Sequence, residues 1–308
     1  MKIVFMGSPE FAVPILESLV SKHQVLAVYT QPDRPGGRGL ESTPSPVKRR
    51  ASALGLNVIQ PNSLKPAEVV TDLQALKPEA IIVAAYGLLI PRSILDIPPS
   101  GCINVHPSLL PRHRGASPVT AAILSGDGVT GVSIMLLDEG WDTGPVLAQV
   151  STPILATDTT GLLTVRLSKL GAQLLEDTLP RWQAGGIKPQ PQDESKATYS
   201  RLLHKEEGQL DWKLPAPDLE RRVRAFQPWP GCFTQWRGKM LKVLQAEALA
   251  GSGEPGRVIG KGDIIGVGAG DGILRLKVVQ LEGKKTMDIQ DFIRGQTGFI
   301  GSILPNIR

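Results

Sequence analysis

MKIVFMGSPEFAVPILESLVS, residues 1–21, carries the clearest signal of the fold class. Its apolar run Lys2–Met6 has the length of a buried strand, and apolar side chains then recur at helical spacing. We expect Ser8 to be the N-cap and Pro9 the first residue of a helix that extends to Ser21. The stretch predicts one strand and one helix of a βαβ unit, from which parallel sheets are built.

The same alternation of short apolar runs and helical patterns continues through the first half of the chain. It predicts an α/β domain with a Rossmann-like, open and mainly parallel sheet. We expect a long helical pattern over residues 159–182 to close this domain. The further strands predicted in this domain are Val25–Tyr29, Asn57–Gln60, Ala80–Ala84, Gly101–Val105 and Gly131–Leu137.

The last third of the chain has short apolar runs separated by Gly-rich turns, a pattern typical of a small OB-like β-barrel. GVGAGDG, Gly266–Gly272, is predicted to be a hairpin turn, because glycine adopts the positive φ that such turns need. A segment rich in Pro, Gly, Gln and charge precedes the barrel and predicts a linker. We expect residues 1–188 to form the α/β domain, 189–207 the linker and 208–308 the barrel.

Composition excludes several classes of protein. At 308 residues, 41% hydrophobic and 20% charged, the chain reads as a globular protein, and its longest apolar run, residues 80–90, is too short to span a bilayer. The start of the chain turns polar before a signal-peptide core could form, so we expect a cytoplasmic protein without a membrane partner. Cys102 and Cys232 have no metal-ligand or disulfide spacing. Gly7 stands alone where a dinucleotide fold carries GxGxxG, which disfavours NAD or FAD.

Positive charge is unevenly distributed. Residues 1–200 carry 17 Lys and Arg against 17 Asp and Glu, whereas residues 201–308 carry 17 against 12. The net charge of +5 therefore lies in the last third, which suggests a polyanionic partner, or else a basic domain that is merely soluble. QPDRPGGRGLESTPSPVKRR, residues 31–50, is a second basic segment and is too long for a tight βα loop. We expect it to project from the α/β domain, either as a binding loop or as an exposed loop with incidental charge.

INVHPSLLPRHRG, residues 103–115, contains two of the four histidines. Asn104 and His106 share one face at the carboxyl end of a predicted parallel strand, where open α/β sheets bind ligands. A carboxamide and a protonated imidazole can donate hydrogen bonds to an oxygen that gains negative charge during acyl transfer. The alternative is a polar strand end bonded to neighbouring backbone. LLDEGWDTGPVL, residues 136–147, adds three acids, of which Asp142 between two glycines is the preferred partner for the histidine over Asp138 and Glu139.

Together these segments resemble the folate-dependent formyltransferase family, and within it the methionyl-tRNA formyltransferases. The resemblance implies formyl transfer from 10-formyltetrahydrofolate to the amino group of methionyl initiator tRNA. It implies no metal, because the folate nitrogen already activates the formyl group, and we expect a monomer. The motifs that carry it are MGSPEFA, QPDRPGGRG with PSPVK, AAYG, INVHPSLLPRHRGASP, DEGWDTGPVL, KEEGQLDW, RAFQPWPG and IQDFIRGQTGF.

The resemblance also assigns roles to residues. Asn104, His106 and Asp142 match the catalytic trio of the family, whereas His113 is expected to be a surface neighbour. The segment that contacts tetrahydrofolate in the family is matched by Ser108, Leu109, Leu110 and Pro111. The basic loop resembles the insertion that inspects the acceptor end of tRNA, with contacts expected from Arg38, which aligns with the key arginine, and from Arg34 and Lys48. Leu40 and Glu41 depart from the family there, where basic residues are frequent.

Two related enzymes would keep the same trio: a formyltransferase acting on an amino sugar nucleotide, and a formyltetrahydrofolate hydrolase. Neither has a reason to carry a basic loop together with a basic β-barrel. A third alternative is a non-catalytic RNA-binding protein, against which the intact trio argues. The basic segments therefore favour tRNA as the acceptor.

Overall fold

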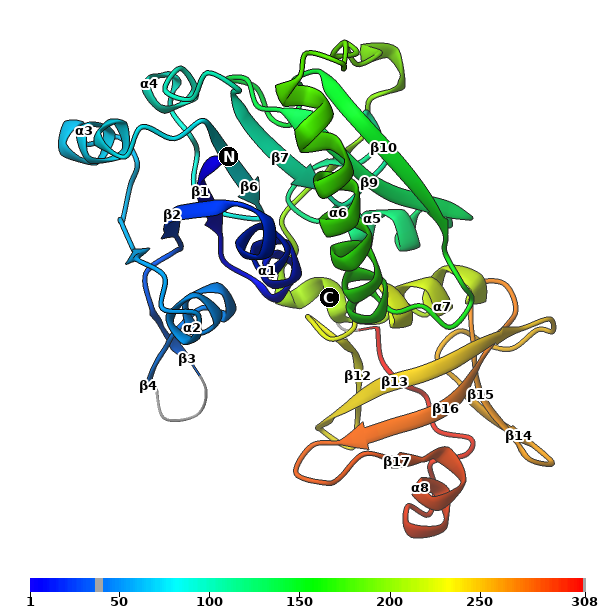
Figure 1. Cartoon of the computed structure of the whole chain (residues 1–308). Helices are drawn as coiled ribbons and strands as arrows, with labels where there is room; N and C mark the ends of the chain where they lie inside the picture. Colours follow the sequence, from blue (N-terminus) through cyan, green and yellow to red (C-terminus); the bar gives the residue numbers. More distant parts are fainter. Residues whose placement is uncertain (37–40, 307–308) are drawn as a thin grey trace. The chain divides into compact units, whose positions relative to one another are not determined.

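The computed structural model describes residues 1–36 and 41–306, so that Arg38 and Leu40 of the basic loop lie outside the described residues, as do the side chains of Arg34 and Glu41. The chain divides into two compact units (Figure 1). The first comprises Met1–Pro118, Val129–Pro153 and Thr164–Ser200, and the second comprises Val119–Gly128, Ile154–Leu163 and Arg201–Arg308. Helix α6, Thr160–Gln183, begins in the second unit and continues in the first.

The first unit is built on a mixed sheet that has seven strands within the described residues, in the order β10-β9-β7-β6-β1-β2-β5. Strands β7, β6, β1, β2 and β5 run parallel, which confirms the predicted α/β fold class. Every residue of β6 and β7 is buried, as expected of parallel strands covered on both faces. The bounds are Lys2–Gly7 (β1), Gln24–Tyr29 (β2), Val58–Ile59 (β5), Ala80–Ala84 (β6), Cys102–His106 (β7), Val129–Leu136 (β9) and Val146–Pro153 (β10).

Two strands at one edge differ from the sequence prediction. Strand β9 pairs antiparallel with β7, and β10, which the sequence did not predict, pairs antiparallel with β9. From Ala148 onward the residues of β10 alternate between half-buried and exposed, so the strand lacks the continuous apolar run of its parallel neighbours. Strand β7 also extends one residue further than expected and ends at His106.

Helices cover both faces of this sheet. Gly171 of α6 lies so close to β7 that an added Cβ would be 2.9 Å from Val105 Cγ1. On the other face, Ile81 of β6 belongs to a buried cluster with Leu73 of α3 and Ile94 of α4. The helices of the first unit besides α6 are α1 (Val13–Lys22), α2 (Pro46–Ala53), α3 (Ala67–Ala75) and α4 (Arg92–Leu95).

The expected start of the first helix is wrong. A short 3-10 turn, Glu10–Ala12, precedes α1, whose N-cap is Ala12. The Ser8 hydroxyl instead donates to the Tyr86 carbonyl at 3.2 Å and accepts the Gln31 amide at 3.1 Å. Ser8 therefore connects the ends of β1, β2 and β6, and its hydroxyl does not cap the helix.

The second unit contains an antiparallel sheet in the order β12-β13-β16-β15-β14, with β17 paired to β16. The predicted change from an α/β domain to a β domain in the last third of the chain is confirmed by this antiparallel sheet. The hairpin turn predicted within Gly266–Gly272 is confirmed, because it joins β15 to the antiparallel β16. The bounds are Cys232–Trp236 (β12), Lys239–Leu249 (β13), Val258–Lys261 (β14), Ile264–Gly268 (β15), Ile273–Leu281 (β16) and Met287–Asp288 (β17), with helices α5 (Pro118–Leu124), α7 (Ala216–Ala225) and α8 (Ile289–Gly295).

Two segments expected to be irregular contain regular structure. In the basic loop, β3 (Arg34–Gly36) pairs with β4 (Glu41–Thr43), and residues 46–50 belong to helix α2 rather than to a loop. In the expected linker, β11 (Tyr199–Ser200) pairs in parallel with β8 (Arg114–Gly115). The linker segment up to Ser200 thus belongs to the fold of the first unit.

Cys102 and Cys232 are both free and buried. Among the described helices, none is both long and apolar enough to cross a membrane.

Candidate active site

Asn104 and His106 lie on one face at the end of β7 and are only 8% and 4% exposed. Strand β7 runs parallel to β6, so its last residues lie at the carboxyl edge of the parallel strands, where ligands bind in open α/β sheets. Two buried polar side chains at this edge need polar partners. Those partners come from two loops, one between β9 and β10 and one that directly follows β7.

Asp142 is the first partner. It lies in the loop between β9 and β10 and adopts a left-handed backbone conformation with φ 55°. Its Oδ1 accepts a hydrogen bond of 3.3 Å from Asn104 Nδ2, and its Oδ2 lies 3.6 Å from His106 Nδ1. The structure therefore brings together the three residues that the sequence singled out.

Asp138, which competed with Asp142 in the sequence analysis, serves its own loop. Its Oδ1 accepts hydrogen bonds from the Gly140 amide at 3.0 Å and from Thr143 Oγ1 at 2.7 Å. The carboxylate that faces the histidine is that of Asp142.

His113 provides the second contact, and its expected place on the surface is wrong: it is 5% exposed. His106 Nε2 lies 3.1 Å from the His113 carbonyl oxygen. A carbonyl oxygen only accepts, so Nε2 must carry a proton and donate. Nδ1 is then the nitrogen of His106 that faces Asp142. His113 also has a left-handed backbone, with φ 57°.

The expected folate segment follows His106, and its backbone is held by hydrogen bonds with two serine hydroxyls. Ser108 is fully buried, and its hydroxyl donates to the Arg112 carbonyl at 2.6 Å. Ser133 Oγ donates to the Ser108 carbonyl at 2.6 Å and accepts the Leu110 amide at 3.0 Å. Leu109 and Pro111, which follow His106 closely in sequence, are half-buried and leave part of their apolar surface exposed.

Three residues that the sequence analysis missed complete the site: Arg114, Gln192 and Glu194. Arg114 is fully buried, and its two terminal nitrogens donate to the two carboxylate oxygens of Glu194 at 2.7 and 2.8 Å. The pKa of Glu194 is lowered by these hydrogen bonds from Arg114. Gln192 Oε1 accepts a bond of 3.0 Å from Arg114 Nε. Gln192 and Glu194 lie in a polar, Pro-rich segment with no pattern that would connect it to residues 104–142.

Lys48, expected to contact tRNA, forms an ion pair within the first unit. Its Nζ lies 2.6 Å from Asp33 Oδ2, and Gln60 Nε2 donates to Asp33 Oδ1 at 2.7 Å. The hydrogen bond from Lys48, with that from Gln60, lowers the pKa of Asp33. These three side chains fasten the base of the β3–β4 hairpin.

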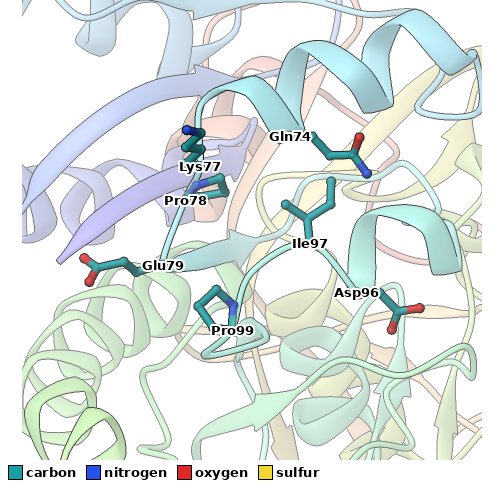
Figure 2. A pocket seen from close by; sticks show the side chains of 7 residues that line it. All are labelled: Gln74, Lys77, Pro78, Glu79, Asp96, Ile97 and Pro99. Atoms are coloured by element: carbon teal, nitrogen blue, oxygen red, sulfur yellow. The ribbon is translucent and has the colours of Figure 1, made fainter.

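A surface pocket lies at the opposite edge of the parallel strands (Figure 2). Glu79 and Pro99 line it and precede β6 and β7, whereas the trio follows the end of β7. Within the part of the chain that the structure describes, no group of three His, Cys, Asp or Glu side chains is placed to hold a metal ion. The polar cluster around Asn104, His106 and Asp142 is the candidate active site.

Known families match both units of the chain. The family described as "Formyl transferase" matches residues 1–179, and "Formyl transferase, C-terminal domain" matches residues 202–297. A methionyl-tRNA formyltransferase of Dehalococcoides mccartyi is 49% identical over 307 residues, which cover 98% of this chain and 97% of the relative. The corresponding protein of Chloroflexus aurantiacus is 50% identical over 264 residues, 85% of each chain. The chain belongs to the methionyl-tRNA formyltransferase family.

Solved structures agree with this family at the level of the fold. An N-formyltransferase of Helicobacter canadensis, in complex with folinic acid and dTDP-3-aminofucose, has a TM-score of 0.66 and 16% identity; the match covers 90% of this chain and 98% of that one. HypX of Aquifex aeolicus in complex with tetrahydrofolic acid has a TM-score of 0.65 and 17% identity, and the match covers 98% of this formyltransferase but only 48% of HypX. At these identities the likeness concerns the fold alone.

Proposed function

We propose that this enzyme transfers the formyl group of 10-formyltetrahydrofolate to the amino group of methionyl initiator tRNA. The observation that carries the proposal is the meeting of Asn104, His106 and Asp142 at the carboxyl end of β7. The chain surrounding this cluster matches methionyl-tRNA formyltransferases over nearly its whole length. Solved proteins of similar fold were captured with tetrahydrofolic acid or folinic acid, which supports a folate as the donor.

We infer that Asn104 and His106 stabilise the formyl oxygen as it gains negative charge. Asn104 has two N–H donors on Nδ2, and one bonds Asp142, which leaves the other for the oxygen. Nε2 of His106 is committed to His113, so a protonated ring would use Nδ1–H. Two such donors beside the formyl group would supply the electrostatic stabilisation that acyl transfer requires.

Asp142 would take the proton from the attacking methionyl amine. A new C–N bond then forms to the amine, the bond between the formyl carbon and the folate nitrogen breaks, and the proton passes to that nitrogen. Oδ2 is the oxygen nearest to His106, so carboxylate and imidazole share the proton transfer as a coupled pair. The reaction needs no metal in this scheme, because the donor nitrogen already activates the formyl group.

The remaining assignments follow the same proposal. Ser108, Leu109, Leu110 and Pro111 would contact the folate, and the partly exposed Leu109 and Pro111 suit the apolar face of an aromatic ring system. Residues 1–188 would carry the reacting groups, and residues 189–207 would join the two domains, with the part up to Ser200 folded into the first unit. Residues 208–308, with their excess of positive charge, would contact the tRNA backbone. Arg34 and Arg38 would read the acceptor end, with Lys48 at the base of their loop. We infer a monomeric enzyme of the cytoplasm.

A product analysis tests this proposal. Labelled 10-formyltetrahydrofolate is offered with methionyl initiator tRNA, methionyl elongator tRNA, an amino sugar nucleotide, or water alone. We expect label on the initiator form, with strong preference over the elongator form. Label on the sugar, or free formate as the main product, would overturn the proposal that methionyl initiator tRNA is the formyl acceptor.

Matched variants test the trio. Asp142→Asn should lower kcat by roughly a hundredfold or more, since it removes the proton acceptor. Asp138→Asn makes the same chemical change in the same loop and keeps the Oδ1 acceptor used by Thr143. Its activity should remain close to that of the wild type. Equal losses in both variants would remove the catalytic role of Asp142.

A further inference from the structure

His106 is positioned by two residues with strained backbones. Asp142 and His113 both have positive φ, at 55° and 57°, although neither is glycine. Each supplies one contact to His106, through a carboxylate at Nδ1 and through a carbonyl at Nε2. Such conformations persist only where surrounding structure holds them in place. The question is which part of the chain holds both.

One segment of the expected linker contacts both residues. Gln192 Nε2 donates to the Asp142 carbonyl at 2.8 Å and to the Gly144 carbonyl at 2.7 Å. Thr198 Oγ1 accepts the His113 amide at 2.8 Å. Each of the two strained residues therefore forms a hydrogen bond to this segment through its own backbone.

The same segment is anchored along its length. Gln190 and Val146 exchange two backbone hydrogen bonds of 2.8 Å at the start of β10. In the middle, Glu194 forms its ion pair with the fully buried Arg114. At the end, β11 pairs with β8 and the Ala116 amide donates to the Ser200 carbonyl at 3.2 Å. Residues 190–200, which we call the strap, are thus fixed at both ends and at the centre.

We propose that the strap is a positioning element of the active site, and that Gln192 is the positioning residue that orients Asp142 toward His106. Gln192 touches neither the imidazole nor the carboxylate in this structure; it acts by holding the Asp142 and Gly144 carbonyls of the loop that presents the carboxylate. The inference rests on the proposed function, because it takes Asp142 and His106 as the reacting pair. It adds a role for a segment whose composition is that of a linker.

Gln192→Glu tests the proposal with little change of volume. A glutamate keeps one oxygen for Arg114 Nε but loses both N–H donors, so its other oxygen would face the Asp142 and Gly144 carbonyl oxygens. Gln190→Glu is the matched control, because Gln190 anchors the strap through its backbone alone, and its exposed side chain bonds only the Lys188 carbonyl within the described contacts. Both variants carry the same new charge in the same segment.

We expect Gln192→Glu to lower kcat by roughly tenfold to a hundredfold, with the KM values for tRNA and folate little changed. The Gln190→Glu control should match the wild type. A higher KM with an unchanged kcat, or an equal kcat in the two variants, would overturn the positioning role of Gln192.

A spectroscopic measurement separates this inference from the proposed function. The chain has four histidines, so the ring nitrogens of His106 can be assigned by substitution. We expect the His106 ring signals and the Gly115 amide signal, whose proton is donated to Asp142, to move in Gln192→Glu and to stay in Gln190→Glu. If the signals do not change in Gln192→Glu, the positioning role of the strap is overturned, even if the enzyme is active. If the signals move but the wild-type protein formylates no tRNA, only the proposed function is overturned.

If Gln192→Glu fails to fold, Thr198→Val replaces it. Valine has nearly the shape of threonine but cannot accept the His113 amide. The same split between kcat and KM and the same movement of the His106 signals are expected. A Thr198→Val enzyme with wild-type kcat and wild-type spectra would overturn the proposal.

Discussion

The backbone amide of Gly115 donates a hydrogen bond of 2.8 Å to Oδ2 of Asp142, the carboxylate oxygen that lies 3.6 Å from His106 Nδ1. Gly115 is also a residue of β8, which pairs with β11 of the strap. One glycine thus connects the strap to the Asp142 carboxylate. Its backbone has φ 103°, and an added Cβ would lie 2.4 Å from the Ser200 carbonyl oxygen.

Gly115→Ala should therefore separate β8 from β11 and displace the amide from Asp142. We expect kcat to fall by roughly tenfold or more. The free energy of unfolding should fall by about 1–3 kcal/mol, from backbone strain at positive φ together with the clash. Steady-state kinetics and urea unfolding measure the two effects.

Gly55→Ala is the matched control for that substitution. Gly55 also has a positive φ, at 69°, but an added Cβ there would have no heavy atom within 4 Å. Its variant should lose some stability through strain and keep its kcat. Equal kcat in the two variants would show that the Gly115 contact does not affect catalysis.

The acid stability of the strap follows from Glu194. Its ordinary pKa is 4.5, and the hydrogen bonds from Arg114 lower its pKa in the folded chain. The unfolded chain then binds more protons than the folded chain as the pH falls below 4.5, so the ion pair stabilises the fold fully above that pH. This contribution is lost as the pH falls through the lowered folded pKa.

Thermal melts of Glu194→Gln measure this. At neutral pH the variant should melt below the wild type, and the difference should vanish well below pH 4.5, where Glu194 is protonated in both states. Glu206→Gln removes one charge at an exposed glutamate and should melt like the wild type at every pH. A difference that grows on acidification would contradict the lowered pKa of Glu194 in the folded chain.

Sequence reasoning succeeded where one local pattern determines the structure. Ala80–Ala84 forms a strand as predicted, because burial on both faces demands a continuous apolar run. The face shared by Asn104 and His106 follows from strand periodicity alone. Asp142 could be favoured only by its flanking glycines, because its meeting with His106 depends on the antiparallel pairing of β9 with β7.

The predictions that failed depend on contacts between distant residues. Ser8 has the composition of an N-cap, but its hydroxyl bonds residues 31 and 86 instead. The strap has the composition of a linker, and only its bonds to residues 113, 114 and 142 make it part of the site. His113 stands between two arginines in a loop motif, and its burial results from the same bonds. Such pairings leave no periodic signal in the sequence.

The two cysteines should be inert in the folded protein. Burial raises the pKa of Cys102 to about 12 and that of Cys232 to about 12. At pH 8 only about one thiol in ten thousand would be ionised, and the thiolate is the reactive form. Mass spectrometry after treatment with a maleimide should show no addition to the native protein and two additions after denaturation. Rapid addition to the native chain would contradict the burial of these thiols.

Lys48 should affect tRNA binding by holding the base of the β3–β4 hairpin rather than by contacting a phosphate of the tRNA. Its ammonium is committed to Asp33, which Gln60 also holds. Lys48→Gln and Asp33→Asn should therefore have the same effect, a several-fold higher KM for tRNA with an unchanged KM for folate. Arg38→Ala should also weaken the binding of tRNA without affecting the folate site. It should in addition reduce the salt dependence of tRNA binding, because an arginine that contacts a phosphate releases counterions.

Salt titrations of tRNA binding distinguish the two roles of Lys48. A residue that contacts a phosphate contributes about one unit to the slope of log affinity against log salt, whereas a residue that only holds the loop leaves the slope unchanged. We expect the slopes of Lys48→Gln and Asp33→Asn to equal that of the wild type. The opposite outcome is a reduced slope in Lys48→Gln alone, with Asp33→Asn binding tRNA as tightly as the wild type. It would show that Lys48 contacts a phosphate and that its ion pair with Asp33 is not needed for tRNA binding.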